Sequence, residues 1–383
     1  MADFPDFSYL MPTEIRFGAG SFEQTAQCSK PLGQKPFVVT GKHSARAIGA
    51  LDRLASLLPQ AFIYDKAEEN PTTDQCDAAA AVCRENRCDV VIAIGGGSPM
   101  DVAKAVAGLA LNDGPCRDFI GSDLFTKGVL PIITVPTTAG TGSEVTPYSV
   151  LVDTSENQKR TIKGHGLFPR VALLDPELTT SLPPDITAYT GLDALSQAME
   201  GMVSKKSTAV GDILALEACR LIKQWLPRAV TEPPNLEARG YMLLAAMLSG
   251  CVIAQSGTTL VHGMGYYYTL HCGIQHGLAN GLLLAPVFRH NAAHLPEKVA
   301  AIASALGSPG PPHAAPENIV RALHTLLEEC GVSKAARDAG VDEDQLAEFA
   351  RDCHSDPYRF KNQPGDLSQD DVLRLYRESW AGM

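Results

Sequence analysis

The sequence predicts an α/β domain over residues 1–182 and an all-helical domain over residues 183–383. In the first half, continuous apolar, β-branched runs alternate with helical stretches, a pattern typical of parallel strands that helices cover on both faces. After the double proline Pro183-Pro184, strand signals nearly vanish and long helical patterns follow. The length of 383 residues suits two or three domains at roughly 150 residues each.

The elements of both domains follow from apolar periodicity. Five short apolar runs are the predicted strands, at residues 37–40, 62–64, 90–94, 130–135 and 171–174. Two helical patterns between them are the predicted crossovers, at residues 74–87 and 101–111. The first helices of the second domain are predicted at residues 188–203, 209–225 and 236–256.

Composition and charge bound the classes of function. Hydrophobic residues make up 45% of the chain and charged residues 20%, which is ordinary globular usage. The formal net charge is −11, and so acidic a chain is a poor binder of nucleic acid or of an anionic membrane. The N-terminal segment lacks the features of a signal peptide, and the ten cysteines form no C-x-x-C pair. We therefore expect reduced thiols and a cytoplasmic location.

A long stretch without formal charge lies between Arg239 and Arg289. It contains no uninterrupted apolar 18-mer, so it predicts buried helices of a globular core rather than a membrane span. It also contains His262, His271 and His276. Buried histidine rings need hydrogen-bond or metal partners.

A glycine-rich turn links a predicted strand to the next helix. Gly96, Gly97 and Ser98 follow the strand at 90–94, and Ser98 with Asp101 fits a capping box. Backbone N–H groups at such a helix start can hold a phosphate. The run is neither G-x-G-x-x-G nor a P-loop, so a simple tight turn is the alternative.

A second polar loop follows the strand at 130–135. It contains Thr137, Thr138, Thr141 and two glycines. Loops at the carboxyl edge of an open parallel sheet bind ligands, and these hydroxyls could line a groove for ribose and phosphate. The alternative is a loop whose hydroxyls cap their own backbone.

Polar residues at helical spacing suggest a metal site in the second domain. Asp193 and Gln197 are spaced i, i+4, as are His262 and Tyr266, and His276 follows in the same charge-free stretch. One carboxylate with two imidazoles suits Fe²⁺, Zn²⁺ or Mn²⁺ better than a thiolate-type site would. The alternative is a solvated Asp–Gln pair and structurally satisfied core histidines.

The ordered motifs GGGSPMDVAK, PTTAGTGSEVT, GLDALSQAMEG and VHGMGYYY…HGLAN together resemble the iron-containing (group III) alcohol dehydrogenase family. The resemblance implies a dehydroquinate synthase-like architecture, in which a dinucleotide-binding α/β domain precedes a helical metal-binding domain. It also implies an active site in the cleft between the domains and a homodimer or larger homo-oligomer.

By position, the resemblance places the metal ligands on Asp193, Gln197, His262 and His276, with Fe²⁺ or Zn²⁺ as the ion. The family usually has His where this chain has Gln197, and an amide oxygen is the weaker donor, so we expect a loosely bound metal. The cleft histidine of many members falls on Tyr266, which is therefore the catalytic candidate, either as a proton donor or as a packing aromatic.

The resemblance also assigns residues of the first domain to the parts of the dinucleotide. The pyrophosphate falls on Gly96, Gly97 and Ser98, with Asp101 close by. Thr137, Thr138 and Thr141 would contact phosphate and ribose, and Lys159 the ribose on the nicotinamide side.

The residues after the first predicted strand bear on the choice of cofactor. Members that prefer NAD tend to have Asp there, whereas this chain has Gly41, followed by Lys42, His43 and Ser44. Because no acid at position 41 repels a 2′-phosphate and donors lie nearby, we expect NADP(H) to be favoured over NAD(H).

The resulting hypothesis is a metal-assisted hydride transfer that interconverts a small aldehyde and a primary alcohol. Its partners would be small molecules, with no nucleic acid and no membrane. One alternative is a reductase of acid-bearing short aldehydes, similar to phosphonoacetaldehyde or sulfoacetaldehyde. Another is a catalytically weak NADP(H)-binding protein, because Gln197 replaces a metal-binding histidine.

Overall fold

The computed structural model describes residues 6–156 and 158–383. Contacts between residues divide the chain into two compact units, an α/β unit over Met11–Ser181 and a helical unit over Leu182–Met383. The described residues before Met11 group with the helical unit, although the sequence-based division assigns them to the α/β domain. An α/β unit followed by a helical unit is the predicted fold class, which is confirmed.

A parallel sheet forms the centre of the α/β unit. Its strand order is β1-β9-β6-β4-β2-β3, and every neighbouring pair is parallel. The strands are β1 (Glu14–Phe17), β2 (Pro36–Gly41), β3 (Phe62–Ala67), β4 (Val90–Gly95), β6 (Ile132–Pro136) and β9 (Val171–Leu174). The five predicted strands are all present in this sheet, and the edge strand β1 is the strand of this sheet that was not predicted.

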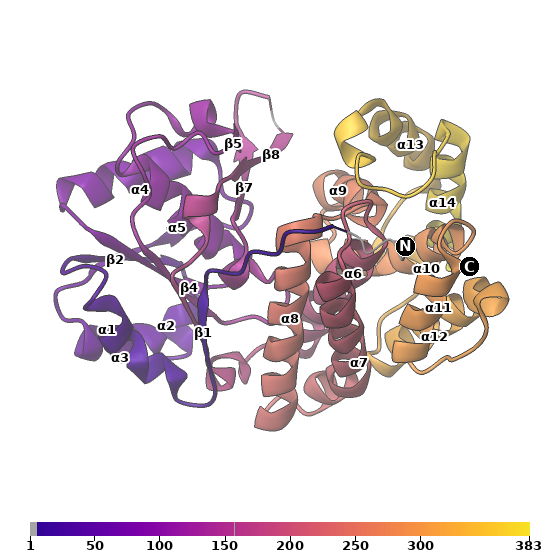
Figure 1. Cartoon of the computed structure of the whole chain (residues 1–383), viewed down its shortest axis with the longest axis horizontal. Helices are drawn as coiled ribbons and strands as arrows, with labels where there is room; N and C mark the ends of the chain where they lie inside the picture. The colour runs from indigo at the N-terminus through magenta and orange to yellow at the C-terminus, as the bar shows by residue number, and fades with distance from the viewer. Residues whose placement is uncertain (1–5, 157) are drawn as a thin grey trace. The chain divides into compact units, whose positions relative to one another are not determined.

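Helices cover both faces of this sheet (Figure 1). On one face, Phe37 and Val39 of β2 pack with α4 (Thr73–Glu85) and α5 (Gly97–Leu109). On the other, Val38 packs with α1 (Thr25–Ser29), α2 (Ser44–Ala47) and α3 (Ala50–Leu57). Burial on both faces explains why Phe37, Val38 and Val39 of β2 and the residues of β4 are apolar at successive positions rather than alternating.

A small second sheet, unpredicted from the sequence, has the strand order β5-β8-β7. It consists of β5 (Gly121–Ser122), β7 (Tyr148–Asp153) and β8 (Gln158–Lys163). The antiparallel pair β7–β8 places Lys159 opposite Val152.

The helical unit is built around three long helices that pack against one another, α6 (Pro184–Val203), α7 (Ala209–Thr231) and α8 (Leu236–Ser256). α6 starts four residues before the predicted start, with proline in its first turn, where the missing N–H removes no intrahelical bond. The other α-helices are α9 (Leu260–Cys272), α10 (His276–Asn291), α11 (Pro296–Ala305), α12 (Ala315–Glu329), α13 (Leu346–Ser355) and α14 (Gln369–Ala381).

The charge-free stretch forms most of α8 together with α9 and the greater part of α10. By length and composition α8 could cross a membrane, but 72% of its most apolar window is buried inside the protein, where it packs on α6 and α7. The prediction of buried core helices is therefore confirmed.

Candidate metal centre

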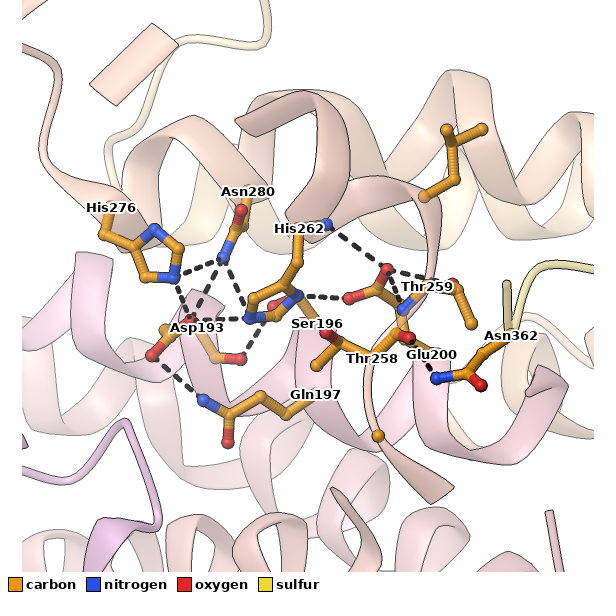
Figure 2. Close-up of polar contacts among 12 residues, drawn as sticks. Asp193, Ser196, Gln197, Glu200, Thr258, Thr259, His262, His276, Asn280 and Asn362 are labelled. Carbon is orange, nitrogen blue, oxygen red and sulfur yellow. Dashed lines mark hydrogen bonds and ion pairs between the residues drawn. The ribbon is translucent and has the colours of Figure 1, made fainter. Parts of the chain in front are cut away.

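One face of α6 carries three buried polar side chains. Asp193 and Gln197 are each 4% exposed, and Glu200 is fully buried. The spacings of four and three residues place all three on one side of the helix. Figure 2 shows Asp193 and Glu200 directed toward His262 and His276 of α9 and α10, and Gln197 directed toward Asp193.

Two histidines from the following helices meet Asp193. His262 lies in the first turn of α9, and His276 is the first residue of α10. The Nε2 atoms of both rings lie 3.6 Å from Oδ1 of Asp193. One ligand atom from each of the three residues lies within 4.8 Å of the other two. The structure thus brings three of the four predicted metal ligands into one cluster.

Glu200 orders the ring of His262 and the start of α9 at once (Figure 2). Its Oε1 accepts hydrogen bonds from the backbone N–H groups of Thr259 and His262, at 3.0 and 3.3 Å. These are donors that a helix start cannot satisfy internally. Its Oε2 contacts Nδ1 of His262. A carboxylate only accepts hydrogen bonds, so Nδ1 is the donor and Nε2 faces Asp193.

The two amide side chains complete the cluster. Nδ2 of Asn280 lies 3.1 Å from Oδ1 of Asp193, and 3.3 and 3.2 Å from Nε2 of His262 and His276. Nε2 of Gln197 donates to Oδ2 of Asp193 at 3.1 Å. Oε1 of Gln197 is buried and has no hydrogen-bond partner in the described part of the chain.

These residues fit a divalent ion on three grounds. The acceptor atoms converge, and the 3.6 Å separations are near the roughly 3.3 Å between ligands of a tetrahedral ion bound at about 2.05 Å. The unpartnered oxygen of Gln197 costs free energy in a buried site unless something binds it. Carboxylate, imidazole and amide oxygen suit Fe²⁺, Zn²⁺ or Mn²⁺.

The electrostatics of the cluster also favour a cation. Burial alone would lower the pKa of His262, but Glu200 and Asp193 overcome it and raise that pKa to about 10. Burial raises the pKa of Asp193, yet His276 and His262 bring it below its ordinary value. A negative potential therefore surrounds the ligand atoms, and a proton and a metal ion would compete for the rings.

Tyr266 lies one turn after His262 on α9 and is 9% exposed. Its ring meets that of Tyr267 edge-on at 5.4 Å. The guanidinium of Arg359 lies 4.1 Å from the centre of the Tyr266 ring. The ring is thus packed on two sides, and its catalytic role stays a prediction.

The two predicted phosphate loops of the α/β unit lie against each other. β4 and β6 are neighbours, with Gly95 opposite Pro136. A Cβ atom on Gly96 would lie 3.2 Å from Oγ1 of Thr138, and one on Gly97 would lie 2.9 Å from Cγ2 of Thr141. A side chain at Gly97 would force Thr141 to shift and one at Gly96 would crowd Thr138, so the two loops lie against each other at the carboxyl edge of the sheet.

The start of α5 differs from the expected capping box. The helix begins at Gly97 with Gly96 as the N-cap residue, and no side chain caps it. Ser98 is therefore inside the first turn rather than before it. A helix start without a side-chain cap has N–H groups available for an anion.

Asp101, the fifth residue of α5, and Lys159 of β8 are close enough to interact electrostatically. The Asp101 carboxyl accepts hydrogen bonds from the Val150 backbone and from Ser143, and burial raises its pKa to about 7. Lys104, fully buried, donates to Ser143 O and Tyr148 O at 2.7 and 2.8 Å. This lysine ties α5 to the loop after β6.

The residues of the predicted 2′-phosphate site lie at the end of β2. A Cβ atom on Gly41 would lie 4.0 Å from Oγ of Ser44, and Ser44 is exposed at the start of α2. Lys42, however, forms an exposed ion pair with Glu68 at 2.7 Å. An acid therefore stands beside the lysine that the sequence analysis assigns to a phosphate.

Sequence reasoning assigned no role to Glu200, Asn280 or Lys104. Glu200 is seven residues after Asp193 and Asn280 four after His276, so helical spacing alone places each on the ligand face. Lys104 carries no comparable signal, because its burial depends on the loop that folds over α5.

Comparison with known proteins agrees with this arrangement. A family model described as iron-containing alcohol dehydrogenase matches residues 12–176. A second, described as the C-terminal part of the Fe-containing alcohol dehydrogenase family, matches residues 187–380.

Individual relatives match over nearly their whole length. The chain is 33% identical to a 1,3-propanediol dehydrogenase of Klebsiella pneumoniae, over 98% of this chain and 99% of the relative. It is 31% identical to an NAD-dependent methanol dehydrogenase of Bacillus methanolicus, over 97% and 99%.

Two solved structures show the same fold. A 1,3-propanediol oxidoreductase superposes with a TM-score of 0.93 at 32% identity, over 98% of this chain and all of the other. A sulfoacetaldehyde reductase of Bifidobacterium kashiwanohense in complex with NAD⁺ superposes with a TM-score of 0.89 at 34% identity, over 99% and 100%.

Proposed function

Because this chain belongs to the iron-containing alcohol dehydrogenase family, we propose that it interconverts a small aldehyde and a primary alcohol by metal-dependent hydride transfer with NAD(P)(H). The observation that carries the proposal is the convergence of Asp193, His262 and His276 within 4.8 Å. Carboxylate and imidazole groups in this arrangement are what a catalytic divalent ion needs.

Asp193, Gln197, His262 and His276 are the proposed ligands. A bound Fe²⁺ or Zn²⁺ ion would supply Lewis-acid polarisation of a carbonyl oxygen, and a bound nicotinamide would supply the hydride. Gln197 enters the set by rotating its amide so that the unpartnered Oε1 faces the other ligands. Gln197 lacks the imidazole donor of other members, so we propose that this metal is held more weakly than theirs.

The chain's own side chains prepare the site for that reaction. Glu200 keeps Nε2 of His262 directed at Asp193. Asn280, fully buried, fixes the Asp193 carboxylate through its amide nitrogen. The apolar helices around the cluster keep the local dielectric low, which strengthens charge stabilisation. The hydroxyl of Tyr266 is the proposed proton donor to the oxygen of the product alcohol.

The α/β unit is the proposed dinucleotide site. The uncapped start of α5 would bind the pyrophosphate through Gly96, Gly97 and Ser98, and Asp101 would act behind them through Ser143. Thr137, Thr138, Thr141 and Lys159 are the proposed phosphate and ribose contacts.

We also propose that the enzyme prefers NADP(H) to NAD(H). It is supported by Gly41, which carries no acid, and by the hydroxyl of Ser44 nearby. It is opposed by the Glu68 carboxylate beside Lys42 and by the relatives named as NAD-dependent or solved with NAD⁺. Comparing kcat/KM for NADPH and NADH decides it, and a tenfold preference for NADH would end it.

Acid-bearing short aldehydes are the second candidate substrates. The similarity to a sulfoacetaldehyde reductase supports this candidate. We further propose a small-molecule metabolism in the cytoplasm, without nucleic-acid or membrane partners, and a homodimer or larger homo-oligomer. The acidic net charge of −11 and the ten free cysteines support the cytoplasmic location and the lack of nucleic-acid or membrane partners. Sedimentation of the purified protein tests the oligomeric state.

The decisive experiment combines a metal assay of the purified protein with NAD(P)H oxidation over a panel of neutral and acid-bearing aldehydes. We expect stoichiometric or loosely bound divalent metal and turnover that is lost in His262→Ala. Unchanged turnover in that variant would refute the assignment. Cofactor binding without metal and without turnover would instead indicate a catalytically weak dinucleotide-binding protein.

A further inference from the structure

A cationic side chain from the C-terminal part of the helical unit lies on the helix that carries the candidate metal ligand His262. Arg359 ends the short 3₁₀ helix Pro357–Arg359, and its guanidinium carbon is 4.1 Å from the centre of the Tyr266 ring. Its backbone packs on the same turn, since a Cβ atom on Gly263 would lie 3.2 Å from Cβ of Arg359 and 3.3 Å from its carbonyl oxygen.

The donors of this guanidinium are largely unused. Its side chain is only 17% exposed, yet it donates no hydrogen bond to another residue in the described part of the chain, and its Nε is enclosed and unpartnered. Asp356 Oδ2 lies 3.2 Å from that Nε, but the atoms are not aligned for a hydrogen bond. An arginine carries five N–H donors in a planar fork.

A shielded cation with free donors is costly unless an anion binds it. Asp356 balances part of the charge through its Oδ2, which lies 3.2 Å from Nε, while its Oδ1 accepts the N–H of Tyr358 at 3.0 Å. The aromatic ring of Tyr266 supports the flat face of the guanidinium, and Asp356 lies beside its Nε, which leaves the terminal Nη groups for a ligand. Sulfonate, phosphonate and carboxylate groups match those groups in charge and geometry.

The position of Arg359 sets the size of the ligand. His262 and Tyr266 are four residues apart on α9, which corresponds to about 6 Å along the helix. A two- or three-carbon aldehyde that carries an acid group at its other end is of comparable length, because each C–C bond is about 1.5 Å long. The carbonyl can then lie at the His262 cluster while the acid group reaches the guanidinium above Tyr266.

We propose that Arg359 is a specificity-determining residue that binds the acid group of a short anionic aldehyde or of the corresponding alcohol. This inference rests on the proposed function, because it assigns the carbonyl end of the same substrate to the His262 cluster. The occupant is a small organic anion, and the experiment distinguishes the three acid groups. The contrary outcome is that Arg359 has only a structural role and holds the C-terminal segment on α9.

The test measures binding, so it does not depend on turnover. The metal- and cofactor-loaded protein is titrated calorimetrically with 2-hydroxyethanesulfonate, 2-hydroxyethylphosphonate and 3-hydroxypropionate, and with 1-propanol as the neutral probe. We expect at least one acid-bearing alcohol to bind at least tenfold more tightly than 1-propanol. Arg359→Gln should remove that advantage without changing the affinity for 1-propanol, and Arg359→Lys should restore part of it.

Arg228→Gln is the matched control, because Arg228 also lies over an aromatic ring, 5.1 Å from the centre of Trp225, on a helix without candidate ligands. It should leave all four affinities unchanged. Metal content and thermal unfolding show whether each variant is folded. Equal binding of acid-bearing alcohols by wild type and Arg359→Gln, or an equal loss for acidic and neutral probes, would overturn the proposal. Absence of aldehyde turnover in the same preparations would refute the proposed function alone.

Discussion

Glu200 binds both the ring of His262 and the first turn of the helix on which His262 lies. The two residues are 62 positions apart, and their contact joins α6 to α9. One carboxylate oxygen caps the helix while the other fixes the imidazole. The orientation of a candidate metal ligand therefore depends on a fully buried acid that would not itself bind the metal.

Replacing this acid should weaken metal binding without unfolding the protein. In Glu200→Gln a single oxygen has to serve the donors that two oxygens accept in wild type, so the ring of His262 is less well oriented. We expect the Kd for Zn²⁺ to rise roughly 10- to 100-fold, measured by competition with a chromogenic chelator. The exposed Glu217→Gln on α7 is the control, and identical affinities for the three proteins would contradict the expectation.

The identity of residue 197 should set the metal affinity in both directions. Gln197→His supplies an imidazole from the same face of α6, and we expect Zn²⁺ and Fe²⁺ to bind about tenfold more tightly, or roughly 1.4 kcal/mol. Gln197→Met keeps the length and removes the oxygen, so binding should weaken. The same chelator competition measures both variants. Were Gln197→Met to bind metal as tightly as wild type, the amide oxygen would not be a ligand.

The glycine after His276 is required by close packing against α6. A Cβ atom on Gly277 would lie 1.9 Å from the backbone oxygen of Tyr189, and backbone cannot move aside as a flexible side chain can. Gly277→Ala should cost roughly 1–3 kcal/mol in the free energy of unfolding and displace His276. We therefore expect a lower Tm and a smaller rise in Tm on adding Zn²⁺.

Gly211→Ala provides the comparison for that variant. A Cβ atom at Gly211 would come no closer than 3.2 Å to Oγ1 of Thr208, and α7 carries none of the candidate ligands. Its Zn²⁺-induced change in Tm should equal that of wild type. An unchanged response in Gly277→Ala as well would show that His276 tolerates movement of its helix start.

Glu144 should make the stability of the α/β unit depend on pH. Burial raises the pKa of this carboxyl from 4.5 to about 7, so the folded protein binds a proton that the unfolded chain releases between these values. The contribution of Glu144 to stability is therefore full below pH 4.5 and is lost as the pH rises through 7. Glu144→Gln has no ionisable group at this position, so its stability should not fall in this way as the pH rises. Between pH 4.5 and 7.5 it should gain on the order of 3 kcal/mol relative to wild type.

Denaturant unfolding at several pH values measures that difference. Glu85→Gln, at the exposed end of α4, should follow wild type at every pH. A constant difference between Glu144→Gln and wild type would mean that the carboxyl titrates alike in the folded and unfolded protein.

Glu68 should lower the affinity for a 2′-phosphate. Its carboxylate pairs with Lys42 at 2.7 Å, so it both repels the phosphate and occupies the nearest ammonium group. In Glu68→Gln we expect the ratio of kcat/KM for NADPH to that for NADH to rise about two- to tenfold, because exposed ion pairs are worth up to about 1 kcal/mol. The neighbouring Glu69→Gln is the control. A ratio that is unchanged in both variants would show that Lys42 does not bind the 2′-phosphate.

Local patterns in the sequence were sufficient for the fold class and for most elements. The runs that became β4 and β9 are apolar throughout, and β2 is apolar from Phe37 to Val39, because both faces are covered. β1 and the pair β7–β8 escaped prediction because their burial is partial, which removes the continuous apolar signal. Ser98 was misplaced as a cap because the chain enters α5 through Gly96 without a side-chain cap.

The chain alone determined which side chains are available and which share a helix face, as with Asp193 and Gln197, because that spacing is set by the geometry of one helix. Tertiary structure decided which of those faces meet: Asn280 reaches Asp193 across 87 residues, and Arg359 reaches Tyr266 from the C-terminal segment. Contacts between elements depend on how their apolar faces pack together, and a periodicity confined to one element carries no information about its neighbour.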